Sequence, residues 1–489
     1  MADDLVLVLM RHKSYAALFA GAALVSFGLT PGYIALARRM GWVDRPGGRK
    51  AHAAPTPTMG GMVVMATVIV GAVAALMLPN RVGDMVREHR PAILTALACS
   101  TVMMLVGIID DRRGLRPRVK LLTQLVLAMA AFMLGFRIAA ITLPALGSVN
   151  LPLGALFSPL LTIVWIVGVT NAVNLTDGLD GLAAGVGFVA AAANAAIAIY
   201  LQNYYMAVMM LLLAGALLGF LPWNFHPARV FLGDTGSLAM GMLLALCSLH
   251  AAQKAQTAVM ILVPLCALGY PIFDTLLAVA RRTLAGQPVF GSDREHIHHR
   301  MERRAYGASG AAVRIYVASL LLIGVGVLLS SMNHFYVGLG MAAALALAAF
   351  CVRVLGYFEW AGWSTLERDR DENRVLHAAA DLARLKVAAA RSLPELLDGL
   401  GALAGELNAT AVELEHGGEL HRWSRPAAAP IGDRPAVSVR LGVASGFIEL
   451  IATQALDPRG SALWDELCRR AGARLERWSV GRPPGSAHA

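Results

Sequence analysis

The chain has 489 residues, of which 57% are hydrophobic and only 15% are charged, and its mean hydropathy is +0.59. Soluble globular domains are about half apolar and a quarter charged, so this composition excludes an ordinary soluble protein and indicates a polytopic membrane protein. The net charge of +10 does not indicate nucleic-acid binding, because Arg and Lys cluster at the ends of apolar runs instead of forming a basic patch with interleaved aromatic residues.

Runs of about 20 apolar residues, the length that crosses the hydrocarbon core, predict about eleven transmembrane helices in an all-α membrane domain over residues 1–358. The predicted spans lie near residues 15–37, 59–79, 91–109, 119–136, 156–173, 182–201, 205–221, 237–250, 256–280, 312–330 and 334–354. The first run is too long for the apolar part of a signal peptide, so we expect it to be retained as a span.

Arg and Lys are concentrated in alternate loops, which is the pattern of cytoplasmic loops. The loops after the first, third and ninth predicted spans carry this excess, and the loops between them are poorer in basic residues. We therefore predict an extracytoplasmic N-terminus and a cytoplasmic C-terminus. The same orientation places every acidic and histidine motif described below in the cytoplasm, although these motifs played no part in the charge count.

Two regions outside the spans have patterns of their own. Residues 138–154 alternate in polarity and predict a short extracytoplasmic hairpin. After about Leu366 the apolar runs stop, and we predict a small cytoplasmic α/β domain over 366–480, followed by a disordered tail over 481–489. Its predicted elements are a helix over 375–403 interrupted near Pro394, strands around 412–415, 437–441 and 446–452, and a helix over 460–478. Its alternation and hairpin resemble GAF-like sensor domains, but we favour a role in oligomerisation or in contact with another enzyme over ligand sensing.

The third predicted span ends in two adjacent carboxylates, Asp110 and Asp111. Because adjacent carboxylates repel each other, one of them should bind a cation or have a raised pKa, which suits a metal ligand or a general base. A solvated loop in which arginines act as counter-ions explains the pair equally well.

Two further segments place acids beside glycines. In NAVNLTDGLDGLAAG (171–185), five polar residues crowd a helix end: Asn171, Asn174, Thr176, Asp177 and Asp180. An ordinary polar cap explains one or two such residues but explains all five poorly. In FLGDTGS (231–237), Asp234 could bind a metal and Phe231 could stack on a base. An aspartate at a helix start is, taken alone, more often a cap than a site.

The remaining candidates lie later in the chain. Asp274 lies inside the ninth predicted span, where an ionisable side chain is functional by default, although a structural ion pair would also explain it. The segment REHIHHR (294–300) gathers three imidazoles in a predicted cytoplasmic loop. No cysteine accompanies them, so we expect them to contact phosphates beside a hard-oxygen Mg²⁺ site and not to bind zinc, with an inert surface loop as the alternative.

The ordered motifs DDxxxLxPxxKLLxQ, NAVNLTDGLDGLAAG, FLGDTGS, PxxDT and HIHHR resemble those of the polyprenyl-phosphate N-acetylhexosamine-1-phosphate transferases. The resemblance covers about residues 30–310 and extends by topology to 354. It implies transfer of a sugar 1-phosphate from a UDP-sugar to undecaprenyl phosphate, with Mg²⁺ or Mn²⁺ as cofactor. The first loop, with Lys50 and His52, also resembles that of the family, although any positively charged cytoplasmic loop would explain it too.

The resemblance also implies roles for individual residues. Expected catalytic residues are Asp110, Asp111, Asp274, His296, His298 and His299. Expected substrate-binding residues are Lys50, His52, Lys120, Asn174, Asp177, Asp180, Phe231, Arg294 and Arg300. Expected metal ligands are Asp234 and Asp111. The lipid phosphate would then attack in line and release UMP, with a covalent aspartyl-phosphate route as the alternative mechanism.

The motif HIHHR resembles the branch that transfers N-acetylglucosamine 1-phosphate for O-antigen, lipopolysaccharide, teichoic acid or other surface polymers, as the first membrane step of their assembly. The alternative within the family is phospho-MurNAc-pentapeptide transfer in peptidoglycan synthesis, because NAVNLTDGLDGLA is shared with that branch. An ion-coupled transporter is the alternative of another class, but no internal repeat is visible and the acids lie at helix ends. The expected location is the bacterial inner membrane, with membrane lipid, a second copy in a homodimer and downstream glycosyltransferases as partners.

Overall fold

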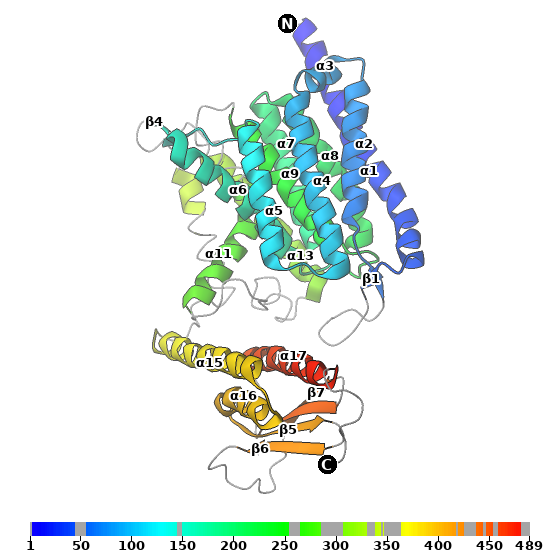
Figure 1. Ribbon diagram of the computed structural model, residues 1–489. Coiled ribbons are helices and arrows are strands. Elements are labelled where there is room, and N and C mark those ends of the chain that lie inside the picture. The colour runs from blue at the N-terminus through cyan, green and yellow to red at the C-terminus, as the bar shows by residue number, and fades with distance from the viewer. Residues whose placement is uncertain are drawn as a thin grey trace. The chain divides into compact units, whose positions relative to one another are not determined.

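The computed structural model describes residues 2–44, 55–143, 149–253, 265–284, 307–329, 338–343, 346, 363–416, 419–424, 437–443, 446–452 and 458–480 (Figure 1). The chain divides into two compact units. The first unit contains Met1–Val279 with Phe290–Trp360, and the second contains Ala280–Val289 with Ala361–Ala489.

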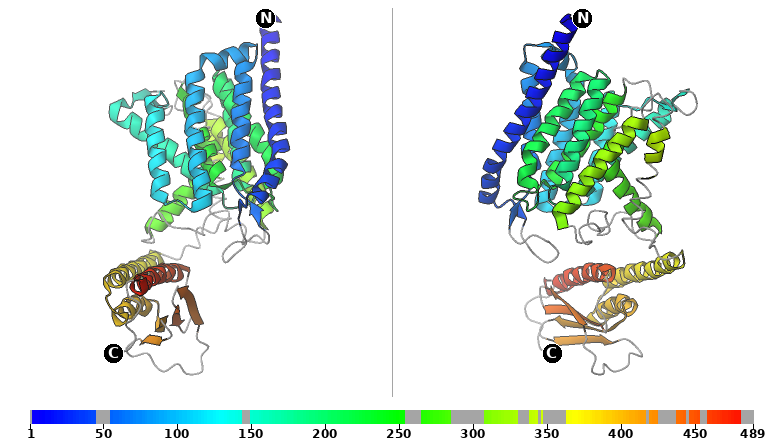
Figure 2. Two further views of the ribbon diagram at one scale, coloured as in Figure 1. Left: turned by 45° about the vertical axis from the view of Figure 1, so that its right-hand side comes forward. Right: turned by 180° about the vertical axis from the view of Figure 1, so that it is seen from behind.

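The described part of the first unit is mainly helical. Its helices are α1 (Ala2–Arg39), α2 (Gly61–Met77), α3 (Arg81–Glu88), α4 (Arg90–Arg113), α5 (Pro117–Met133), α6 (Gly154–Thr176), α7 (Leu182–Tyr200), α8 (Tyr204–Asn224), α9 (Gly233–Gln253), α13 (Gly307–Leu329) and α11 (Gly269–Leu284), whose residues from Ala280 onward are assigned to the second unit. Both views in Figure 2 show most of these helices running side by side. The described part of the predicted membrane domain is therefore mostly helical.

Within the described residues, six helical segments are long and apolar enough to cross a membrane, or seven if the bent pair α2 and α3 is one span. The six are Lys13–Arg39, Arg90–Arg113, Gly154–Thr176, Leu182–Tyr200, Tyr204–Asn224 and Ser309–Leu329. The chain is therefore a polytopic membrane protein. The total of eleven spans stays a prediction. The described helices α5 and α9, which correspond to two of the predicted spans, are not among these six, and residues 254–264 and most of 334–354 lie outside the described residues.

Helix α9 is the centre of the first unit and packs against α2, α4, α6, α7 and α8. Glycines on its neighbours let the backbones approach closely, as is common where helices pack in membranes. A Cβ atom on Gly61 of α2 would lie 2.1 Å from the Cα of Gly236, and one on Gly107 of α4 would lie 2.4 Å from the carbonyl oxygen of Asp234. The first turn of α9 is thus held between two helices that leave it no room to shift.

Two small antiparallel ribbons connect helices of the first unit. Strand β1 (Val43–Asp44) pairs with β2 (Thr56–Pro57), and β3 (Ala140–Leu143) pairs with β4 (Val149–Pro152). The second ribbon confirms the hairpin that alternation predicts over 138–154.

The second unit combines helices with one sheet. Its elements are α15 (Trp363–Ala389), α16 (Leu393–Glu406), β5 (Ala409–His416), β6 (Glu419–Ser424), β7 (Val437–Val443), β8 (Gly446–Ala452) and α17 (Pro458–Val480). The strands form an antiparallel sheet in the order β6-β5-β8-β7. The predicted interruption near Pro394 corresponds to the break between α15 and α16, where Pro394 occupies the first turn of α16.

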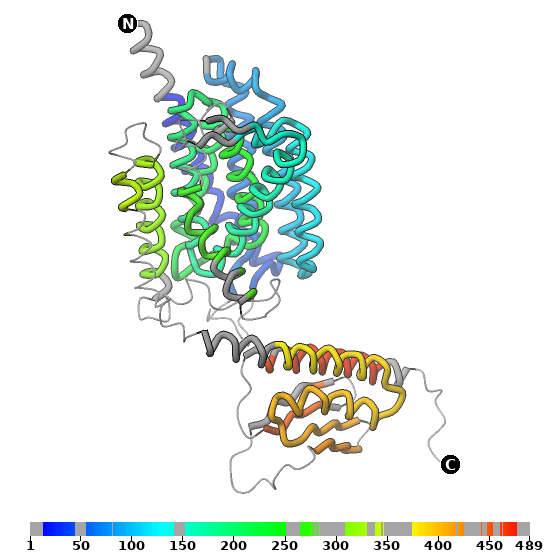
Figure 3. Tube along the Cα trace, turned by 90° about the vertical axis from the view of Figure 1, so that its left-hand side faces the viewer, coloured from blue at the N-terminus to red at the C-terminus, as the bar shows by residue number. Residues whose placement is uncertain are grey.

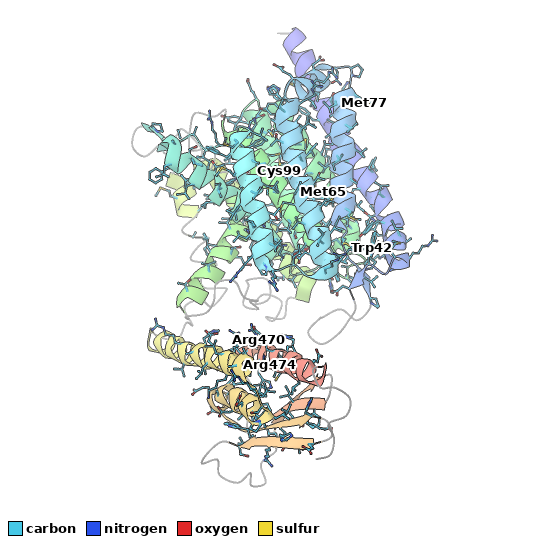
Figure 4. The ribbon with its side chains drawn as sticks, in the orientation of Figure 1. Trp42, Met65, Met77, Cys99, Arg470 and Arg474 are labelled. Carbon is cyan, nitrogen blue, oxygen red and sulfur yellow. The ribbon has the colours of Figure 1, made fainter. Side chains whose placement is uncertain are left out.

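The core of the second unit lies between its helices and its sheet. Trp464 of α17, Leu400 of α16 and Leu450 of β8 are fully buried in one cluster. Helices α15 and α17 lie side by side (Figure 3). The guanidinium of Arg474 on α17, labelled in Figure 4, joins them by donating to the carbonyl oxygen of Ala390 at 2.7 and 3.1 Å.

An ion-pair network adds to this helix contact. Glu466 of α17 accepts hydrogen bonds from Arg384 at 2.7 Å and from Arg470 at 2.9 Å. Partial burial acts to raise the pKa of Glu466, but the two guanidinium groups outweigh it and hold the pKa below its usual value. These groups are partly exposed, so the contribution of the network to stability is small.

The mutation Trp464→Ala should remove about 3–5 kcal/mol of stability from the second unit, because it opens a large cavity in a closed core. Limited proteolysis of the full-length protein should therefore cut this unit much faster than in the wild type. The control Leu420→Ala changes an exposed side chain of β6 and should leave the cleavage rate unchanged. Equal rates for the two variants would contradict the assigned core.

Candidate active site

Lys120 on α5 joins two carboxylates that lie far apart in the sequence. Its Nζ atom donates to Oδ2 of Asp110 on α4 at 2.6 Å and to Oδ2 of Asp234 on α9 at 2.8 Å. All three side chains are only partly exposed, which strengthens their attraction relative to a surface pair. The structure therefore brings the DDxxxLxPxxK and FLGDTGS motifs together.

Asp111 holds the start of α9. Its Oδ1 accepts from the backbone N–H of Asp234 at 3.0 Å, and its Oδ2 accepts from the N–H and the hydroxyl of Thr235 at 3.1 and 2.7 Å. A carboxylate in this place satisfies amides that a helix start leaves unpaired and complements the helix dipole. Gly233 permits the approach, because its φ is +73° and a Cβ atom there would lie 2.6 Å from Oδ2 of Asp111.

Asn174, in the last turn of α6, orients Asp234 from the other side. Its Nδ2 atom donates to Oδ1 of Asp234 at 2.9 Å and lies 2.9 Å from Oγ of Ser237. Each carboxylate oxygen of Asp234 thus accepts a side-chain donor, Lys120 on Oδ2 and Asn174 on Oδ1. Helices α4, α5 and α6 all contribute to fixing this one side chain.

Asp177 follows α6 and adds a further negative charge next to this cluster. Burial raises the pKa of the Asp177 carboxyl well above its usual range, and the charges of Asp234 and Asp111 act in the same direction. A backbone hydrogen bond from Gly233 opposes this shift. The environment of Asp177 therefore favours either a proton or a cation on its carboxyl group.

Asp180 fixes the turn between α6 and α7. Its Oδ2 atom lies 2.8 Å from Nδ1 of His226 and accepts from the backbone N–H of Ala228 at 3.1 Å. The hydroxyl of Tyr316 on α13 donates to the carbonyl oxygen of Gly181 at 2.7 Å. Contacts from two other parts of the chain therefore hold this glycine-rich turn.

Phe231 is held through its backbone beside the β1–β2 ribbon. Its N–H donates to the carbonyl oxygen of Pro57 at 2.8 Å, and its own carbonyl accepts from the N–H of Gly60 at 2.9 Å. Its side chain is partly exposed next to the start of α9. The expected stacking on a base stays a prediction.

The charges of the site do not balance. The carboxyl groups of Asp110, Asp111, Asp177 and Asp234 are joined by contacts or mutual charge effects, and Lys120 supplies one positive charge. Such an arrangement attracts a further cation. Within the described part of the chain, however, no three His, Cys, Asp or Glu side chains are spaced to hold a metal ion by themselves.

The remaining expected site residues are Asp274 and a group that lies outside the described ranges. Asp274 lies on α11, where its side chain is buried. Its catalytic role stays a prediction. Residues outside the described ranges are Lys50, His52, Arg294, His296, His298, His299 and Arg300, and their roles also stay predictions.

Three residues of this region were not singled out from the sequence as site residues: His226, Thr235 and Tyr316. His226 precedes FLGDTGS by a few positions, in a polar segment between two apolar runs. This position could have identified it as a site residue. Thr235 is adjacent to Asp234, but nothing in the sequence shows that its hydroxyl binds Asp111. Tyr316 lies inside an apolar run and carries no sequence signal.

Comparison with known proteins places these contacts in a family. A model described as "Glycosyl transferase family 4" matches residues 93–252, the segment that contains Asp110, Lys120, Asn174 and Asp234. A Bacillus subtilis (strain 168) protein named "Probable undecaprenyl-phosphate N-acetylglucosaminyl 1-phosphate transferase" is 37% identical over 296 residues, which cover 60% of this chain and 78% of that protein. The chain belongs to glycosyl transferase family 4.

Other relatives of this family 4 chain carry related names. A decaprenyl-phosphate N-acetylglucosaminephosphotransferase of Mycobacterium tuberculosis is 35% identical over 316 residues, covering 60% of this chain and 78% of that protein. A phospho-N-acetylmuramoyl-pentapeptide-transferase of Enterococcus faecalis is 33% identical over 299 residues, which cover 57% of this chain and 88% of that protein. The resemblance to polyprenyl-phosphate sugar-1-phosphate transferases that the motifs indicate is confirmed.

The mutation Gly107→Ala should destabilise the family 4 site, because the new methyl group would press on the carbonyl oxygen of Asp234 and on the Cα of Thr235, 2.5 Å away. The matched control is Gly168→Ala in α6, where a Cβ atom meets no other atom within 4 Å. The control variant should be as stable as the wild type or slightly more stable, since alanine has a higher helix propensity than glycine. The unfolding temperature in detergent and the transfer activity should both be lower for Gly107→Ala, and neither should be lower for Gly168→Ala. Equal behaviour of the two variants would refute the close α4–α9 contact.

Proposed function

We propose that this protein transfers N-acetylglucosamine 1-phosphate from UDP-N-acetylglucosamine to undecaprenyl phosphate and releases UMP. The proposal rests on the position of Asp234 at the start of α9, where Lys120 and Asn174 orient its carboxylate in a chain of family 4. The relatives at 35–37% identity are named for N-acetylglucosamine 1-phosphate transfer, and the relative named for the muramoyl-pentapeptide is 33% identical. The N-acetylglucosamine donor is therefore favoured over the peptidoglycan precursor.

The chemistry requires positioning and charge neutralisation more than proton transfer. The second pKa of a phosphate monoester is about 6, so most of the lipid phosphate is already dianionic at neutral pH. Its oxygen attacks the sugar-linked phosphorus in line, the bond from that phosphorus to the oxygen bridging the two donor phosphorus atoms breaks, and UMP leaves. Lys120, poised between Asp110 and Asp234, would attract phosphate oxygens, and Asp110 would hold that ammonium group in place.

The donor set fits Mg²⁺ or Mn²⁺. Mg²⁺ is commonly held by one or two carboxylates together with water and substrate phosphates, so the lack of a three-ligand cage among the described residues does not conflict with it. We propose that Asp234 and Asp177 would hold the ion, which would neutralise the diphosphate of the donor. The bonds that Asp111 accepts from α9 favour a positioning role for it over the metal contact expected from the sequence.

The direction of the protein in the membrane follows from the same proposal. A UDP-sugar donor is a cytoplasmic metabolite in bacteria, and the basic loops favour the same side for the acid cluster. We propose an inner-membrane enzyme of surface-polysaccharide assembly with its site and its second unit in the cytoplasm. The second unit would then act as an accessory domain.

A panel of UDP-sugars tests the proposed reaction directly. Purified protein with undecaprenyl phosphate and Mg²⁺ should release UMP from UDP-N-acetylglucosamine and form the lipid-linked sugar diphosphate, as measured by mass spectrometry of the lipid. Turnover of UDP-MurNAc-pentapeptide alone would overturn the donor assignment. Uptake of a sugar into liposomes without lipid product would overturn the enzyme assignment in favour of a transporter.

The mutation Asp234→Asn should lower UMP release by at least about 100-fold, because it removes the charge that the proposed ion and Lys120 share. The control Asp84→Asn changes an exposed aspartate of α3 and should retain activity. Mg²⁺ should also raise the unfolding temperature of the wild type but not of Asp234→Asn. An equal Mg²⁺ shift in both proteins would remove Asp234 from the metal site.

A further inference from the structure

Helix α15 of the second unit carries an apolar stripe on its outer face. The side chains of Val375, Leu382 and Leu385 are 53%, 51% and 69% exposed. Ala378 and Ala389 are exposed on the same side of the helix. The opposite face, with Ala383 and Val387, is buried in the core. The stripe is therefore additional to the face that holds the unit together.

The spacing of the stripe is that of a coiled-coil seam. Positions 375, 378, 382, 385 and 389 follow one another at intervals of three and four, as positions a and d of a heptad do. A helix that packs only on its own domain needs one apolar stripe, and α15 has two. The second stripe has the geometry required for packing against another helix.

Charged residues beside the stripe indicate what that other helix is. In this register Asp381 occupies position g and Lys386 the following position e, the two positions that pair between parallel helices of a dimer. A second copy of α15 in parallel would thus place Asp381 opposite Lys386 twice, once on each side of the seam. In an antiparallel pair with the same seam centred between Ala378 and Leu382, the two copies of Asp381 would face each other.

Exchange of ion-pair partners would cost little. Asp381 now pairs with Arg384 at 2.8 Å, and Lys386 pairs with Asp398 at 2.9 Å. Asp381, Lys386 and Asp398 are well exposed, with 70%, 41% and 67% of their side-chain surface open to solvent. Surface pairs of this kind contribute about 0–1 kcal/mol, so they do not hold the two side chains away from a partner.

The charge of α15 argues against a lipid surface as the partner. Helices that lie on anionic membranes carry an excess of Lys and Arg on their polar face. The α15 sequence WSTLERDRDENRVLHAAADLARLKVAA contains five basic and five acidic residues. Such a balanced helix gains nothing from anionic lipid, whereas mixed charge beside a heptad seam is typical of helix pairing.

We propose that α15 forms a parallel, in-register two-helix coiled coil with α15 of a second copy of this chain. The seam spans about two heptads and contains two alanines, so it would be weak between free molecules. Each α15 belongs to a chain that is embedded in the membrane. Confinement to the membrane raises the effective concentration of one α15 near another, which can make a weak contact persistent. The second unit would in this way link two copies of the membrane enzyme.

Disulfide cross-linking of cysteine-substituted variants in native membranes tests the proposal. Ala378→Cys lies at position d and should give a covalent dimer on mild oxidation, well above the unsubstituted chain with its five native cysteines. Ala388→Cys is the matched control, because Ala388 is exposed on the same helix but lies off the stripe. Equal dimer yields at the two positions would overturn the proposal.

Charge reversal tests the register. In the Ala378→Cys background, Asp381→Lys should lower the cross-linking yield about threefold to fivefold, and adding Lys386→Asp should restore it. Leu385→Glu should abolish the cross-link, while Leu420→Glu, at an exposed leucine of β6, should not. Failure of the double reversal to restore the yield would overturn the parallel register.

A lipid-bound stripe would give a different result. A fluorophore attached to the thiol of the Ala388→Cys variant, which lies beside the seam and not in it, should not be quenched by spin-labelled lipids if a second α15 covers the stripe. Strong quenching without a cross-link would assign the stripe to the membrane surface and refute the coiled coil.

Discussion

The site depends on one contact, the carboxylate of Asp111 on the first amides of α9. These amides would otherwise be unpaired at the end of a helix in a largely apolar bundle, where an unsatisfied donor is costly. Asp111 therefore fixes where α9 begins. Because Asp234 lies in that first turn, its position relative to Lys120 and Asn174 follows from the same contact.

Glycine packing makes this contact precise. Gly107 and Gly61 bring α4 and α2 against the first turn of α9, so that backbone and not flexible side chains determines its position. The arrangement suits phosphoryl transfer, in which positioning and electrostatic stabilisation do most of the work. The family relationship and the geometry thus support each other at the same residues.

The sequence predicted part of this arrangement and could not predict the rest. Alternation identified the β3–β4 ribbon, and Pro394 marked the break between α15 and α16. The acidic motifs were expected to converge, and Lys120 does join Asp110 to Asp234. Strand β6 was missed, because its exposed, polar residues ELHRWS at the sheet edge carry little apolar pattern. The use of both Asp111 oxygens by backbone amides was also invisible, since side-chain type does not show which groups a carboxylate binds.

The double engagement of Asp234 has a consequence for ligand entry. Both oxygens of this carboxylate already hold a donor, an ammonium on one and an amide on the other. An arriving ion must therefore share or displace one of them. If it displaces Lys120, the freed ammonium stays tethered by Asp110 within the site, where it can meet an incoming anion. Binding of the ion would then exchange one positive charge for another at Asp234. Lys120, which neutralises this carboxylate before the ion binds, would afterwards contact the anionic substrate.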